Sequence, residues 1–158
     1  MYKYLYIFLG SMLPILELRI TIPYGILKSN IDWLVVFVIC VLGNFLICIP
    51  ILYFLEYFDR LAKRFQFFNK VLNRVYKRTR SKANIINKYN YIGIILFVGT
   101  PLPLTGAWTG CLASHLLGLD KKKTLGSIFI GLTMSALIVT AISLVAENLL
   151  PWIGITTL

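Results

Sequence analysis

The stretch Pro14-Ile-Leu-Glu17-Leu-Arg19-Ile-Thr-Ile-Pro23 places an acid and a base two positions apart within a strongly apolar N-terminal segment. Proline lacks a backbone N–H and disfavours the helix interior, so the two prolines predict a break on either side of the charged residues. A lone charge at the centre of a bilayer costs roughly 2.5–3.5 kcal/mol on insertion scales. The stretch therefore predicts a turn inside a membrane, with Glu17 and Arg19 aligned along an extended strip at its tip.

The composition supports a membrane environment for the chain. Of its 158 residues, 58% are hydrophobic and only 14% are charged, and the mean hydropathy is +0.80. A soluble domain of this size needs more polar surface to cover its core. The sequence predicts an all-α integral membrane protein.

The net charge of +10 is distributed unevenly. Ten of the sixteen cations lie between Arg60 and Lys88, and three more form the run Lys121–Lys123. Basic blocks beside apolar spans are typical of cytoplasmic loops that face anionic lipid headgroups. Because no nucleic-acid motif accompanies the charge, we expect membrane lipids and not nucleic acid as partners.

Two segments are long enough to cross a bilayer and two are interrupted. Trp33–Leu55 and Leu125–Ala146 carry no charge and can each span about 30 Å of hydrocarbon. Tyr4–Leu27 contains the charged turn, and Tyr91–Leu119 is broken at its centre by prolines and glycines. If Tyr91–Leu119 crossed fully, the lysine run would be stranded outside, so a re-entrant hairpin fits the positive-inside rule better.

The same reasoning applied to both halves predicts an inverted repeat of two re-entrant hairpins and two transmembrane helices. Residues 1–55 and 91–158 each form a hairpin followed by a span, in opposite orientations, and the hairpin tips meet near mid-membrane. Residues 56–90 lie between them as a basic cytoplasmic segment. In it, Phe58, Leu61, Phe65, Phe68, Leu72 and Val75 recur at helical spacing. This pattern predicts an amphipathic helix that lies on the inner leaflet or forms a short coiled-coil seam between two copies.

The two tips supply the candidate binding residues. In the first, Glu17 is a candidate proton or cation site and Arg19 a candidate anion receptor, unless the two neutralise each other and pin the turn. The second tip, Gly99-Thr-Pro-Leu-Pro-Leu-Thr-Gly-Ala-Trp-Thr-Gly110, is uncharged. It offers hydroxyl groups, freed carbonyls and half-helix ends that present partial charges to the opposite tip. The full set of candidates is Glu17, Arg19, Pro23, Asn44, Thr100, Pro101, Pro103, Thr105 and Trp108.

The other notable residues favour packing. Cys40, Cys48 and Cys111 fall in apolar stretches and match no zinc or disulfide spacing. Ser127, Gly131 and Ser135 form a small-residue stripe at four-residue spacing, which is typical of a close helix contact. No nucleophile elbow, zinc-helix motif or phosphate loop is recognisable, so we expect neither an enzyme nor a cofactor.

Both tips together resemble the family named putative small multidrug export proteins. The resemblance rests on an E-L-R-x-x-x-P-x-G motif, here Glu17 to Gly25, and a P-L-P-x-T-G-A-W-T-G motif, here Pro101 to Gly110. It implies a small exporter in a prokaryotic inner membrane, with ion-coupled transport as one option. The chain is also distantly similar to DedA-like membrane proteins, which implies a lipid or polyprenyl-phosphate translocase or scramblase instead. A third hypothesis is a non-transporting assembly protein that acts through its basic helix. Two spans are few for a transporter, so a homodimer is expected.

Overall fold

The computed structural model describes residues 2–29, 31–62, 83–102 and 105–149, and in these the regular elements are six helices. The helices are α1 (Tyr2–Met12), α2 (Glu17–Ser29), α3 (Trp33–Ala62), α5 (Ala83–Gly99), α6 (Ala107–Leu116) and α7 (Lys121–Leu149). No strand occurs within those ranges. The all-helical prediction is confirmed.

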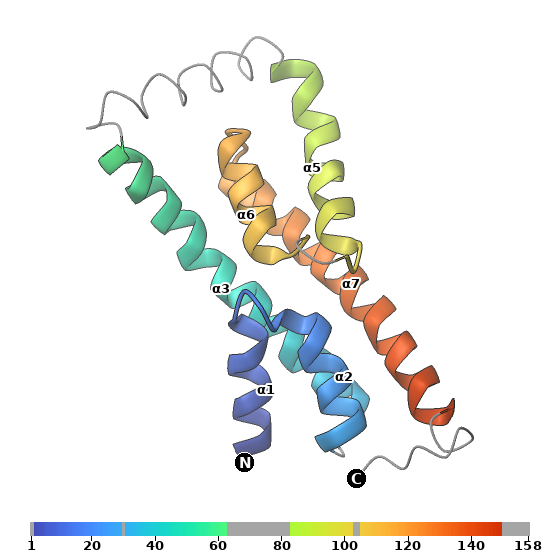
Figure 1. Ribbon diagram of the computed structural model, residues 1–158. Helices are drawn as coiled ribbons and strands as arrows, with labels where there is room; N and C mark the ends of the chain where they lie inside the picture. The colour runs from blue at the N-terminus through green and yellow to red at the C-terminus, as the bar shows by residue number, and fades with distance from the viewer. Residues whose placement is uncertain (1, 30, 63–82, 103–104, 150–158) are drawn as a thin grey trace.

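Two helical hairpins and two long helices make up the fold (Figure 1). The first hairpin is α1 with α2, the second is α5 with α6, and their turns face each other near the middle of the molecule. The long helix α3 contacts α1, α2 and α6, whereas α7 contacts α2, α5 and α6 and also α3. Each long helix therefore packs against both hairpins and fixes the position of one relative to the other.

The two long helices contain the segments predicted to span a membrane. In α3, Trp33–Tyr57 forms an apolar stretch of 25 residues, and α7 provides a second candidate span of 29 residues. At its start, the Asp120 carboxylate accepts a hydrogen bond from the Lys123 backbone N–H at 3.1 Å, as an N-cap does. Lys121 then pairs with Glu56 and lies over the Tyr53 ring, so the beginning of α7 is joined to the end of α3.

The predicted helix break at Pro23 is wrong. Pro23 lies inside α2, which begins at Glu17 and continues to Ser29. Its missing N–H removes one hydrogen bond, but Ile22 and Ile26 on either side are buried against neighbouring helices, which maintain the helix around it. The predicted extended strip is wrong for the same reason. Glu17 and Arg19 belong to α2, which begins at Glu17, and not to an extended segment.

The predicted amphipathic helix between Glu56 and Lys88 falls largely outside the described residues. Its two ends belong to α3 and α5, and the structure does not describe residues 63–82.

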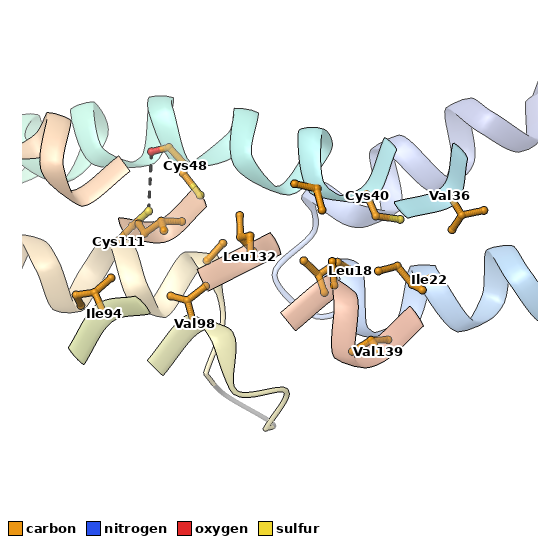
Figure 2. Close-up of a cluster of buried hydrophobic side chains, with 14 of the residues drawn as sticks. Leu18, Ile22, Val36, Cys40, Cys48, Ile94, Val98, Cys111, Leu132 and Val139 are labelled. Carbon is orange, nitrogen blue, oxygen red and sulfur yellow. Dashed lines mark hydrogen bonds between the residues drawn. The ribbon is translucent and has the colours of Figure 1, made fainter. Parts of the chain in front are cut away.

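One continuous core joins both hairpins to both long helices (Figure 2). The core face of α3 repeats every fourth residue, and all of its members are buried: Val36, Cys40, Asn44, Cys48 and Leu52. The side chains of Leu18, Ile22, Cys111, Leu132 and Val139 come from α2, α6 and α7. The three cysteines are free and buried, which confirms that they are packing residues.

The small-residue stripe of α7 is a close-packing face, as predicted. Ser127, Gly131 and Ser135 are buried. A Cβ added at Gly131 would lie 2.9 Å from the Ile95 carbonyl oxygen and 2.9 Å from the Val98 Cβ, both in α5. The absence of a side chain at Gly131 therefore sets how closely α5 and α7 approach.

We predict that Gly131→Ala lowers the free energy of unfolding by about 1–3 kcal/mol, because the added methyl group overpacks the contact between α5 and α7. Gly126→Ala in the same helix is the matched control, since a Cβ there meets nothing within 4 Å. Because alanine has a better helix propensity than glycine, Gly126→Ala should leave the stability unchanged or raise it by up to about 1 kcal/mol. Thermal unfolding of both variants in detergent, followed by circular dichroism, measures the difference. Equal midpoints would contradict the close packing.

Candidate functional site

The first turn joins α1 to α2 and places Glu17 in a strained backbone conformation. The Glu17 N–H donates to the Leu13 carbonyl at 3.0 Å, which closes the turn. Glu17 has a φ of 42°, in the left-handed region that residues with a side chain rarely adopt. Such a conformation costs of order 1–3 kcal/mol and persists where surrounding contacts enforce it. The Glu17 side chain is 8% exposed.

The second turn gathers three oxygen atoms beyond the end of α5. Pro101 has no N–H to continue the helix, and the Leu102 N–H turns back to the Thr100 carbonyl at 2.8 Å. The Thr105 hydroxyl lies 2.9 Å from the carbonyl oxygens of both Thr100 and Leu102. These two carbonyls and the hydroxyl, called here the oxygen cluster, converge on one point.

Arg19 of the first turn binds this oxygen cluster. Its Nη2 donates to the Thr100 carbonyl and to the Thr105 Oγ1, each at 3.1 Å. Its Nη1 donates to the Leu102 carbonyl. The planar guanidinium thus uses its fork of donors on carbonyls that follow the C-terminus of α5, where the helix dipole also favours a cation.

Glu17 faces the other half of the second turn, at the beginning of α6. A Cβ added at Gly106 would overlap both carboxylate oxygens of Glu17, so the carboxylate lies directly against the backbone there. It also faces the backbone N–H of Trp108 in the first turn of α6. The N-terminus of a helix carries partial positive charge and unpaired N–H groups, so it is a favourable neighbour for a carboxylate.

A third contact joins the turns through Trp108. Its indole Nε1 donates to the Met12 carbonyl at the end of α1, at 3.1 Å. Among the residues that the structure describes, Glu17 and Arg19 form no ion pair with each other. Each is directed to an oppositely polarised part of the second turn, and the two opposite charges also attract each other electrostatically.

A cavity of about 540 Å³ lies where the turns meet. Its lining includes four of the predicted site residues: Glu17, Arg19, Pro101 and Trp108. Thr100 and Thr105 contact it through Arg19. Pro23 is farther along α2 and does not line the cavity, and Pro103 is outside the described residues.

Asn44 lies in the core and not in this cavity. It is fully buried on α3, and neither amide atom has a hydrogen-bond partner among the described residues. This candidate binding residue therefore neither lines the cavity nor forms an interhelical hydrogen bond within the described part of the chain.

A second, apolar groove of about 560 Å³ adjoins the first cavity. Trp108 and Thr109 line both. The remaining lining residues come from α3 and α6 and are Ile47, Pro50, Ile51, Phe54, Leu55 and Leu112. This groove could not be predicted from the sequence, because its residues are ordinary apolar positions of two helices that are distant in the chain.

The fold and the site together define a small helical membrane protein in which two helical turns bind each other through polar contacts. The chain belongs to the family described as Putative small multi-drug export protein, whose sequence pattern matches residues 17–138. The match begins at Glu17, the residue that follows the first turn, and includes the second turn and the whole of α3. Comparison with curated proteins and with solved structures gave no match.

We predict that Gly106→Ala destabilises the protein by about 1–3 kcal/mol, because its methyl group displaces the Glu17 carboxylate. The φ of Gly106 is −145°, which alanine adopts without strain, so the cost is steric. Gly93→Ala is the control, since a Cβ there meets nothing within 4 Å.

A double-mutant cycle separates this contact from a general effect on folding. In a Glu17→Ala background, Gly106→Ala should cost less than about 0.5 kcal/mol, because the carboxylate that it displaces is gone. The unfolding midpoints of the two single variants and the double variant give the coupling energy. An unchanged cost in the Glu17→Ala background would show that Gly106 does not pack on the carboxylate.

Proposed function

We propose that this chain is a small exporter of the cytoplasmic membrane whose substrate binds where the two turns meet. In this proposal both hairpins enter the membrane and return to the side from which they came, while α3 and α7 cross it. Helix lengths support this division. α1, α2 and α6 contain 11, 13 and 10 residues, or about 15–20 Å, which is too short for about 30 Å of hydrocarbon.

The contacts between the turns support a location at membrane depth. Non-helical backbone is tolerated there only where protein shields it or where it lines a water-filled cavity. The carbonyls of Thr100 and Leu102 accept hydrogen bonds from Arg19 in addition to those formed within the second turn, so Arg19 supplies donors that water would otherwise provide. With the two hairpins entering from opposite sides, the chain becomes an inverted repeat, an architecture in which transporters bind substrate at the repeat interface.

The observation that carries the proposal is the cavity of about 540 Å³ lined by both Glu17 and Arg19. Its volume is within the range of small-molecule sites. The turns are joined by a few polar contacts centred on these two residues, so a substrate that competes for the contacts can separate the turns. Rocking of one hairpin unit against the other would then open the cavity to alternate sides.

We predict that purified protein in liposomes extrudes a lipophilic cation under a pH gradient, and that Glu17→Gln and Arg19→Gln each lower the rate at least about tenfold. Glu147→Gln and Lys28→Gln are the charge-matched controls, because both residues are exposed and neither lines the cavity. Fluorescence of the cation measures its efflux. Full activity in both the Glu17 and the Arg19 variant would show that the substrate site does not lie in this cavity. Loss of lipid flipping with Arg19→Gln, with no cation efflux in the wild type, would assign lipid translocation instead.

The proposed topology places the C-terminus outside the cytoplasm. After Leu158, a reporter enzyme that works only outside the cytoplasm should be active, and one that works only in the cytoplasm should not. After Lys88, the opposite result is expected. Activity measured in intact cells distinguishes the two. A cytoplasmic signal after Leu158 would mean that an interrupted segment crosses the membrane completely.

A further inference from the structure

We propose that the oxygen cluster of the second turn is a receptor for cations, and that Arg19 occupies it as a tethered competitor of the substrate. The substrate class is then an amphipathic monocation with N–H donors, whose apolar body lies in the groove between α3 and α6. This inference rests on the proposed export function and names the ligand of the same site.

The oxygen cluster presents its acceptors to the guanidinium of Arg19, and Arg19 lines the cavity. Two of its members are backbone carbonyls, which only accept hydrogen bonds, and the Thr105 hydroxyl can direct its own proton to either of them. The nearby Gly106 N–H is already bonded to the Thr109 hydroxyl at 2.8 Å. No charged residue occurs between Gly99 and Gly110. A group that binds there must therefore bring donors, as the Arg19 guanidinium does.

The charge of the site favours a monocation once Arg19 leaves. Glu17 and Arg19 both line the cavity and their formal charges cancel. A cation that displaces Arg19 from the oxygen cluster has the Glu17 carboxylate of the same cavity as a counter-ion. An anion at the oxygen cluster meets only acceptors, so its hydrogen bonding is not satisfied there.

The adjoining groove accounts for the apolar part of the ligand. Trp108 and Thr109 line both the cavity and the groove, so a molecule bound at the oxygen cluster can extend from one into the other. The groove is formed by aliphatic and aromatic side chains, among them Ile51, Phe54 and Leu112. The Trp108 ring lies at the junction, where an aromatic face also attracts a cation.

Displacement of Arg19 links ligand binding to separation of the turns. The hydrogen bonds that the guanidinium gives to the oxygen cluster are replaced by those of the ligand, so the cluster keeps its partners. The released guanidinium is left beside the opposite charge of Glu17, which lines the same cavity. The contact between the turns, however, is lost, because the ligand is not attached to α2. The ligand can contact the oxygen cluster only when Arg19 has left it, so ligand binding favours the state in which the two turns are separated.

The test measures binding of benzylguanidinium to the purified full-length protein in detergent, by calorimetry. Arg19→Ala removes the competitor, so its affinity should rise at least about tenfold over the wild type. Lys28→Ala is the matched control, because it removes one positive charge from the same helix without touching the cavity. Its affinity should equal that of the wild type. Benzylurea, which is neutral and similar in shape, should bind to Arg19→Ala at least about tenfold more weakly than benzylguanidinium does.

A second variant keeps the inference falsifiable if Arg19→Ala does not fold. Arg19→Gln retains a side-chain amide that can donate to the oxygen cluster but has no charge, and it should also bind benzylguanidinium more tightly than the wild type does. Equal or weaker binding in the folded Arg19 variants would overturn the inference. So would tight binding of benzylphosphonate to the wild type that is lost with Arg19→Ala, since Arg19 would then be an anion receptor.

Binding and transport fail in different ways. If benzylguanidinium binds more tightly to Arg19→Ala but wild-type liposomes show no efflux, the cation receptor stands and the export function falls. If efflux depends on Glu17 but the Arg19 variants gain no affinity, export stands and the role of Arg19 as a competitor is wrong.

Discussion

An ionised side chain in an apolar medium must be hydrogen-bonded or paired, because the free energy of removing it from water is otherwise unaffordable. This chain satisfies that constraint across two segments that are far apart in sequence. Arg19 donates to the carbonyls that follow α5, and Glu17 faces the N-terminus of α6. The acid and the base thus complement opposite ends of two helix dipoles. The rest of the structure is arranged so that these two turns can meet.

Several local features follow from that meeting. Glu17 adopts a left-handed backbone conformation, and Gly106 has no side chain where the carboxylate approaches. The long helices α3 and α7 each pack against both hairpins and bring the turns together. At the far end of these helices, Lys121 and Glu56 join α7 to α3. The polar contacts between the turns are few, and such contacts exchange partners more readily than a packed apolar core does. A site built on them can bind a substrate and also change shape.

Much of the fold could be predicted from the sequence, because the length of an uncharged apolar segment shows whether it can form a helix that crosses a bilayer. Trp33–Leu55 and Leu125–Ala146 proved to be helical, and each interrupted segment became a helical hairpin. The small-residue stripe around Gly131 was also predicted correctly as a close-packing face, because its regular spacing can be recognised within a single helix.

Contacts between distant segments could not be predicted in the same way. The sequence drew attention to Glu17 and Arg19 as binding residues, with mutual neutralisation as the alternative. It could not show their partners in the other hairpin, because those partners are backbone groups far away in the chain. Pro23 looked like a helix break, because the effect of a proline depends on the neighbours that pack around it. The apolar groove beside Trp108 gave no signal, since its walls come from α3 and α6.

The central claim is that the two turns meet in the middle of the bilayer, where water cannot supply the hydrogen bonds that Arg19 provides. Trp108 reports the depth directly, since it lies at the junction of the turns and lines the apolar groove. The measurement uses protein with Trp33→Phe and Trp152→Phe in liposomes whose lipids carry bromine at one of several depths. Quenching of Trp108 fluorescence should be strongest with bromine near the ends of the acyl chains. Strongest quenching with bromine near the headgroups would place the turns at the membrane surface and contradict the claim.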